Sequence, residues 1–318
     1  MDIVRNNAPT KRKTGLFGVM FELRRNWVLY ALASPAIIYT FIFGYMTLPY
    51  MIIAFQRFNF RTGIRSPWVG LRNFEHFFRS TWAWTVTRNT LILNLLFIVI
   101  VYASAIALAL LLNEVRHKKY LRVTQSVMLF PYFISWVVVS YMLQGMLNTE
   151  TGLINRFIKG LGYEAVRFYS TPGYWYAILA LLRVWKFIGW TSIIYLSVIA
   201  GIDDSLYEAA RIDGANRWQC ILRITIPLLL PTACILTLME IGRIFYGDFG
   251  MFYAIIRDNG TLMPVAEVID TYVYRTFKMT GQPSLSMAVG MYQSVVGFIL
   301  VFGFNTLVNK LYPEGALF

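Results

Sequence analysis

The chain has 318 residues, of which 57% are hydrophobic and only 14% are charged, and its mean hydropathy is +0.54. A soluble domain of this size carries about a quarter charged residues, so the composition argues against a soluble protein. The net charge of +13 raises the possibility of nucleic-acid binding. The basic residues are scattered between apolar stretches and build no basic domain, so we expect no nucleic-acid partner.

Six apolar runs have about the 20 residues that an α-helix needs to cross a bilayer. They cover residues 27–55, 89–112, 125–147, 174–200, 228–256 and 286–308. We therefore predict an all-α integral membrane protein with about six transmembrane helices. Two cysteines and two histidines are too few for a disulfide framework or a metal cluster.

The segments at the two ends of the chain are more polar than the membrane domain between them. Residues 1–27 are basic and are predicted to be an N-terminal leader, followed by a membrane domain at 28–310 and a tail at 311–318. The first apolar run is too long for a cleavable signal peptide. Lys and Arg are almost evenly divided between the two sides, so the positive-inside rule does not set the orientation.

The connection at residues 201–227 contains a dense polar motif. Ser205 is predicted to cap a short helix whose first turn includes Glu208, where a carboxylate interacts favourably with the helix dipole. Ala209 and Ala210 leave a flat surface, and Gly214 is suited to end the helix in a left-handed conformation.

A second short amphipathic helix is predicted to follow, with Trp218, Ile221 and Leu222 on one face, before Pro227 opens the fifth span. The pattern predicts a small helix–turn–helix outside the membrane, whose apolar surface needs a partner.

The spacing of this loop resembles the coupling loop of ABC importer permeases. Glu-Ala-Ala is followed by three residues, Gly, nine residues and Ile-x-Ile-Pro, and Ile226 stands where the family usually has Leu. The Asp-Gly-Ala triplet at 213–215 fits the version found in sugar importers. By this resemblance, the residues that couple to an ATPase are Tyr207, Glu208, Ala209, Ala210, Asp213, Gly214 and Ala215.

Three further segments resemble those of carbohydrate permeases. They are W-V-G-L-R-N-F at 68–74, F-Y-G-D-F-G at 245–250 and V-I-D-T-Y-V-Y-R at 268–275. The last two are similar to the subset that imports oligosaccharides derived from alginate or pectin.

The resemblance implies a type I ABC importer permease fold with a cytoplasmic coupling helix in the bacterial cytoplasmic membrane, with both termini cytoplasmic. It implies four kinds of partner: a second permease subunit, two ATPase subunits, an external solute-binding protein and membrane lipid. The chain has no G-x-x-x-x-G-K-[ST] phosphate-binding loop. We therefore expect no enzyme activity and no cofactor on this chain, with ATP and Mg²⁺ bound by the partner ATPases.

Ionisable residues inside spans are costly and point to functional sites. Arg183, Lys186 and Trp190 share one helix face, and Glu240 and Arg243 are spaced to pair on another helix. These charges are also explained by snorkelling to the outer surface or by structural ion pairs.

We interpret the cations as the lining of a cavity for an anionic sugar, because Arg binds carboxylates in a bidentate manner. The predicted substrate pathway consists of Arg183, Lys186, Trp190, Glu240, Arg243, Tyr246, Tyr292 and Gln293. The predicted function is half of the translocation pathway for an acidic oligosaccharide. The alternative is an ion-coupled secondary transporter, which would be expected to show inverted repeats or a proton relay.

Overall fold

The computed structural model describes residues 24–115 and 117–311. The described elements are helices, apart from two isolated β-bridges. The α-helices are α2 (Trp27–Thr40), α3 (Arg72–Arg79), α4 (Thr81–Asn113), α5 (Lys118–Phe133), α6 (Trp136–Leu147), α7 (Leu153–Gly160), α8 (Trp175–Ile199), α9 (Asp204–Ile212), α10 (Arg217–Cys220), α11 (Ile226–Ile241), α12 (Phe249–Ile256), α13 (Met263–Ala266), α14 (Ile269–Lys278) and α15 (Pro283–Leu311). In the described part of the chain, π-helices occupy Phe41–Tyr45 and Ile221–Thr225, and 3₁₀ turns occupy Leu48–Phe55, Phe168–Ser170 and Pro172–Tyr174.

The chain divides into two compact units, residues 1–52 and 53–318. The first unit contains α2 and the π-helix that follows it, and no residue of α2 is buried. The predicted leader at 1–27 and the tail at 311–318 lie almost entirely outside the described residues.

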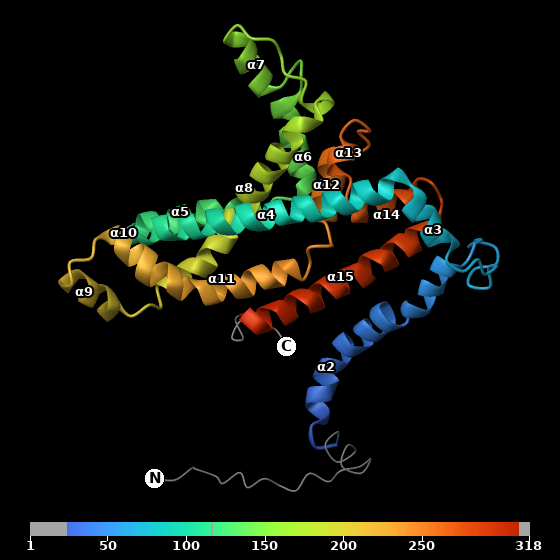
Figure 1. Ribbon diagram of the computed structural model, residues 1–318, viewed down its shortest axis with the longest axis horizontal. Coiled ribbons are helices and arrows are strands. Elements are labelled where there is room, and N and C mark those ends of the chain that lie inside the picture. Colours follow the sequence, from blue (N-terminus) through green and yellow to red (C-terminus); the bar gives the residue numbers. More distant parts are fainter. Residues whose placement is uncertain (1–23, 116, 312–318) are drawn as a thin grey trace. The chain divides into compact units, whose positions relative to one another are not determined.

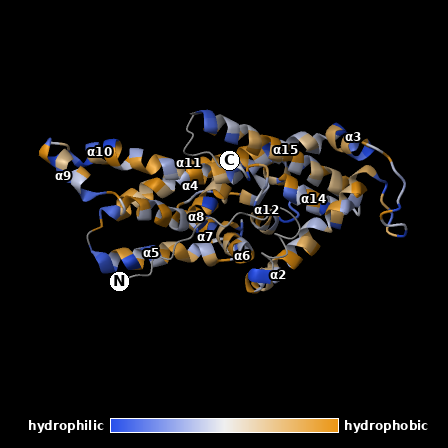
Figure 2. Cartoon of the chain, turned by 90° about the horizontal axis from the view of Figure 1, so that it is seen from below, coloured by the Kyte–Doolittle hydropathy of each residue, from blue (hydrophilic) through white to orange (hydrophobic). Residues whose placement is uncertain are grey.

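The second unit is a set of long helices packed side by side. Helix α4 packs along α8 and contacts α11, and α11 also contacts α15 (Figure 1). Between 17% and 33% of the apolar window of each long span in this unit is buried within the chain. Figure 2 shows many hydrophobic residues along α11 and α15. Several of them are exposed, including Met239 on α11 and Phe298 on α15, so these surfaces need lipid or protein against them.

Within the described residues, five helices are long and apolar enough to cross a membrane, and a bent pair of helices makes up to six. This agrees with the predicted number of spans, although two of the spans are not continuous helices. The third predicted span, 125–147, is α5 and α6, which meet at a bend of 97°. Pro131 lies in the last turn of α5, and Ser135 caps α6 by accepting a hydrogen bond from the backbone N–H of Val138. These two residues explain the break.

The fifth predicted span, 228–256, is wrong at both ends. Its helix begins at Arg217, runs through the π-helix into α11, and stops at Ile241. Gly242 ends α11, and Asp248 starts the separate helix α12 by accepting a hydrogen bond from the backbone N–H of Met251. The hydropathy of residues 249–256 therefore reflects a buried short helix.

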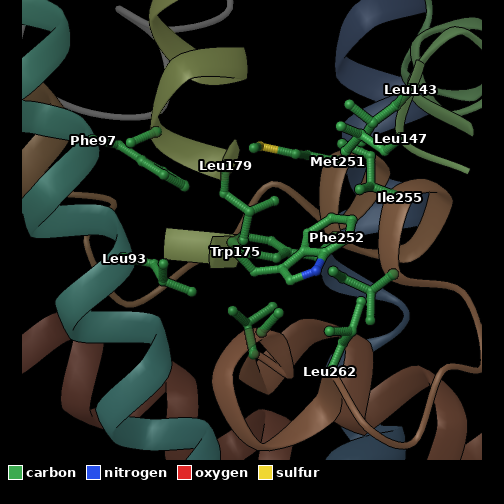
Figure 3. Close-up of a cluster of buried hydrophobic side chains, with 14 residues drawn as sticks. Leu93, Phe97, Leu143, Leu147, Trp175, Leu179, Met251, Phe252, Ile255 and Leu262 are labelled. Atoms are coloured by element: carbon green, nitrogen blue, oxygen red, sulfur yellow. The ribbon is translucent and has the colours of Figure 1, made fainter. Parts of the chain in front are cut away.

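The largest hydrophobic cluster in the described part of the second unit joins α4, α6, α8, α12 and α13 (Figure 3). Trp175 is completely buried in it, and its Nε1 donates a hydrogen bond to the carbonyl of Phe168 at 2.8 Å. Burial of Trp175, Phe252 and Leu262 fixes one end of α8 against α12 and α13.

Candidate functional site

A cavity of about 770 Å³ lies between the long helices of the second unit. Its wall is built from α4, α5, α8, α11, α14 and the non-helical stretch 242–248. The polar and aromatic residues of the wall are Asn94, Tyr102, Tyr132, Arg183, Trp190, Thr191, Glu240, Arg243, Tyr246, Asp248 and Asp270. The volume lies within the range of small-molecule sites, about 300–1,000 Å³.

Arg183 is held in the cavity wall by an ion pair with Asp248, with Nη1 and Oδ2 2.6 Å apart. The same carboxylate oxygen accepts a hydrogen bond from Trp136 Nε1 at 2.9 Å. The guanidinium of Arg183 also lies over the ring of Phe187, 4.1 Å from its centroid. Arg183 therefore has a structural ion pair, one of the two explanations that the sequence left open.

Lys186 does not line the cavity, although it shares a helix face with Arg183. Its ammonium donates hydrogen bonds to the carbonyls of Pro131, Tyr132 and Ile134 at the bend between α5 and α6. An ammonium has three donors, so these carbonyls satisfy it completely.

Trp190 lies in the cavity wall, and its ring stacks on Tyr132, with centroids 4.8 Å apart and planes at 11°. The pair places an aromatic surface of α5 and α8 beside the charged groups. Such a surface suits the apolar face of a sugar ring.

Glu240 and Arg243 both line the cavity. Within residues 24–115 and 117–311, neither side chain forms an ion pair, so the predicted pairing of the two along their helix is not seen. Helix α11 ends at Ile241, so Arg243 lies beyond it, in the turn that follows. Arg243 is exposed and its guanidinium has no hydrogen-bond partner among the described residues.

Tyr246 lines the cavity, whereas Tyr292 and Gln293 do not. Tyr292 packs among aromatic rings that include Phe77 and Phe245. Gln293 is buried, and its Nε2 donates hydrogen bonds to the carbonyl of Phe245 and to Asp270.

The sequence did not single out Asn94, Tyr132 or Asp270 as site residues, yet all three line the cavity. Among the described residues, the wall contains the carboxylates of Glu240, Asp248 and Asp270 and the guanidiniums of Arg183 and Arg243. Positive charges therefore do not predominate in the described cavity wall. A signal for Asn94 was present in the sequence, because an amide in the middle of an apolar run needs a partner. Nothing in the sequence placed Asp270 beside the fifth span.

The segment predicted to couple to an ATPase forms helix α9 and the turn after it. Asp203, and not Ser205 as predicted, caps this helix, because Asp203 Oδ1 accepts a hydrogen bond from the backbone N–H of Ser205 at 2.9 Å. This hydrogen bond lowers the pKa of the Asp203 carboxyl. Gly214 has a φ of +81°, and the N–H of Ala215 donates to the carbonyl of Ala210 at 2.8 Å, so α9 ends in a left-handed turn as predicted.

The predicted coupling residues lie together on this segment. Glu208, Ala209, Asp213 and Gly214 are exposed, and Tyr207, Ala210 and Ala215 are half-buried. The Tyr207 hydroxyl lies 2.9 Å from Thr225 Oγ1, which connects α9 to the helix that enters the membrane domain.

The second helix of the predicted helix–turn–helix is the first part of a long apolar helix, Arg217–Ile241. It begins at Arg217, where Asn216 and Gln219 form a capping box, and continues without interruption into α11. Trp218 is 73% exposed and Leu222 is 60% exposed. Among the described residues, no group of three or more His, Cys, Asp or Glu side chains is arranged to hold a metal ion.

Comparison with known proteins identifies the family. Residues 103–312 match the family of binding-protein-dependent transport system inner membrane components. The chain is 35% identical to Protein LplB of Bacillus subtilis over 93% of each chain. It is 36% identical to the polygalacturonan/rhamnogalacturonan transport system permease protein YteP of the same organism, over 93% of this chain and 92% of the relative.

Two solved structures have the same fold. A chain of a bacterial ABC transporter involved in the import of the acidic polysaccharide alginate is 32% identical, with a TM-score of 0.84 over 92% of this chain and 99% of that one. A chain of the alginate transporter in complex with its alginate pentasaccharide-bound periplasmic protein gives a TM-score of 0.82 at 31% identity, over 92% and 98%. The helical membrane fold and these matches agree, and the chain belongs to the family of binding-protein-dependent transport system inner membrane components, the permeases of ABC importers.

Proposed function

We propose that this permease forms half of the translocation pathway for an acidic oligosaccharide, such as a fragment of alginate or pectin. Two of its relatives are named for the transport of polygalacturonan and of alginate, which are both polymers of uronic acids. The observation that carries the proposal within this chain is the guanidinium of Arg243, which is exposed in a cavity of about 770 Å³ and has no ion-pair partner among the described residues.

The charged groups of the cavity wall divide into those that are bonded to other described residues and those that are available to a ligand. Asp248 is neutralised by Arg183, and Asp270 accepts hydrogen bonds from Gly247 and Gln293. Among the described residues of the wall, Arg243 and Glu240 are therefore the charged side chains that remain for a ligand.

The available groups match the parts of a uronate unit. Arg243 is suited to bind a carboxylate through two parallel hydrogen bonds, and Glu240 is suited to accept hydrogen bonds from sugar hydroxyls. The stacked rings of Trp190 and Tyr132 offer a surface for the face of a sugar ring.

The coupling segment provides the mechanical input in this proposal. Helix α9 exposes Glu208 and Ala209, and the bond between Tyr207 and Thr225 links this helix to the span that carries Glu240. Two ATPase subunits would bind ATP and Mg²⁺ and push on this segment from the cytoplasm. A second permease subunit would complete the cavity, and an external solute-binding protein would deliver the sugar.

The proposal is tested by uptake of a labelled uronate oligosaccharide into proteoliposomes that contain the complete transporter and its binding protein. We expect uptake that requires ATP and is abolished by Glu208→Lys. Glu164→Lys, a charge reversal at an exposed position of the loop between α7 and α8, serves as the matched control and should retain uptake. Uptake driven by an ion gradient without ATP would contradict the proposal and support a secondary transporter.

A further inference from the structure

The backbone between α11 and α12 is not helical, although it lies between two apolar helices. Five residues of this stretch line the cavity: Arg243, Ile244, Tyr246, Gly247 and Asp248. Inside a membrane, non-helical backbone is tolerated where it lines a cavity and where other groups satisfy its hydrogen bonds. The stretch consists of residues 242–248. The side chains that form hydrogen bonds with its backbone therefore determine the shape of the cavity wall.

Asn94 on α4 provides the first anchor. Its Nδ2 donates hydrogen bonds to the carbonyls of Ile244 and Tyr246 at 2.8 and 3.1 Å. Both donors of the amide are used, so Asn94 fixes the backbone on each side of Phe245.

Asp270 on α14 and Gln293 on α15 provide the second and third anchors. Asp270 Oδ2 accepts a hydrogen bond from the backbone N–H of Gly247 at 2.6 Å and another from Gln293 Nε2 at 3.0 Å. The same nitrogen of Gln293 donates to the carbonyl of Phe245 at 2.8 Å. The two side chains thus form a connected network with the backbone of residues 245–247.

The backbone at Gly247 lies too close to α14 for a larger residue. A Cβ atom at this position would lie 2.9 Å from Val268 Cγ2 and 3.1 Å from Asp270 Oδ2. The close approach is what allows the N–H of Gly247 to reach the Asp270 carboxylate.

We infer that Asn94, Asp270 and Gln293 are positioning residues for sugar transport: by holding residues 242–248 from three different helices, they set where Arg243 and Tyr246 meet the oligosaccharide. This inference rests on the proposed function, because it assigns a role to that same cavity. Gln293 does not line the cavity, so its effect on the sugar passes through the groups that it holds, the carbonyl of Phe245 and the carboxylate of Asp270.

The test measures the apparent KM and maximal rate of ATP-driven uptake for Asn94→Leu and Gln293→Met in the reconstituted transporter. Asn89→Leu is the matched control. Asn89 also lies on α4 and donates to two carbonyls, those of Pro264 and Glu267, both at 3.1 Å. It holds the segment around α13 and does not line the cavity. The melting temperatures of all three variants are measured as well, because each variant loses side-chain hydrogen bonds and is expected to lose stability.

We expect Asn94→Leu and Gln293→Met to raise the apparent KM by about ten- to a hundredfold, the scale expected when residues that support a site are lost and its ligand-binding groups move by about 1 Å. Asn89→Leu should lower thermal stability similarly but keep the wild-type KM. A wild-type KM in both anchor variants, or an equal rise in the control, would overturn the inference. Absence of ATP-driven uptake in the wild-type protein would instead contradict the proposed function.

Discussion

Arg183 and Asp248 form an ion pair that joins the middle of α8 to the start of α12, with Nη1 and Oδ2 2.6 Å apart. Both side chains are largely buried, with 18% and 24% of their surfaces exposed. Asp248 also accepts hydrogen bonds from Trp136 Nε1 and from the backbone N–H of Met251. One carboxylate therefore ties together α6, α8 and α12 beside the cavity.

Removing one partner of this pair is expected to destabilise the protein more than removing both. Arg183→Met leaves a partly buried carboxylate uncompensated, and Asp248→Asn leaves the guanidinium uncompensated. We expect a coupling energy of about 1–3 kcal/mol in a double-mutant cycle of thermal unfolding in detergent. Strictly additive losses would show that the two side chains do not stabilise each other.

Lys186→Met is expected to weaken the bend between α5 and α6. The substitution leaves the carbonyls of Pro131, Tyr132 and Ile134 without their donor, which costs roughly 1–3 kcal/mol for a buried polar group. Lys186→Arg keeps a charged donor and should recover part of the loss. Because Lys186 does not line the cavity, the preference for acidic over neutral sugars should not change. A lost preference at normal stability would place Lys186 in the substrate pathway after all.

Gly189→Ala is expected to push α8 away from α5. A Cβ at this position would lie 2.0 Å from the backbone oxygen of Met128, and overpacking of this kind costs about 1–3 kcal/mol or more. The matched control is Gly290→Ala on α15, where a Cβ would meet no atom within 4 Å. The control should be neutral or stabilising by up to about 1 kcal/mol, because Ala favours the helix. Equal melting temperatures for the two variants would contradict the close packing.

Glu267 lies between α13 and α14, outside the candidate membrane spans, and makes the stability of this segment depend on pH. Burial raises the pKa of its carboxyl from an ordinary value near 4.5 to about 7. Arg275 Nε lies 3.2 Å from Oε1, but the two atoms are not aligned for a hydrogen bond, and the attraction does not offset burial. The folded state therefore binds the proton more tightly than the unfolded state does.

The stabilisation from this proton is complete below about pH 4.5 and is lost as the pH rises through 7. The full change in the free energy of unfolding is on the order of 3 kcal/mol, since one pKa unit corresponds to about 1.4 kcal/mol. Wild-type melting temperature should fall between pH 5 and pH 8, and Glu267→Gln should remove most of that fall. A wild-type melting temperature that rises over this interval would show that Glu267 is ionised and well paired.

The sequence predicted the parts of the molecule that depend on local pattern. The apolar runs located the spans, and the spacing from Glu208 to Gly214 located a helix with a left-handed end, which Gly214 forms at φ +81°. The choice of cap was wrong, because Asp203 competes with Ser205 for the same helix start and its carboxylate accepts the stronger, charge-assisted hydrogen bond.

The candidate site was harder to predict because it depends on contacts between distant residues. Arg183 and Lys186 have equivalent positions on one helix face, yet one meets a carboxylate 65 residues away and the other meets backbone carbonyls. The end of α11 at Ile241 was also hidden, because hydropathy alone does not distinguish a spanning helix from two shorter ones.

The charge preference of transport tests the role of the cavity most directly. ATP-driven uptake of a uronate oligosaccharide should be compared with uptake of a neutral oligosaccharide of the same length, in wild type and in Arg243→Gln. Wild type should take up the acidic sugar faster than the neutral one. In the variant, uptake of the acidic sugar should fall about tenfold, because its carboxylate loses a charged partner. Uptake of the neutral sugar should not change. Undiminished uptake of the acidic sugar by Arg243→Gln, or no preference in wild type, would contradict the account.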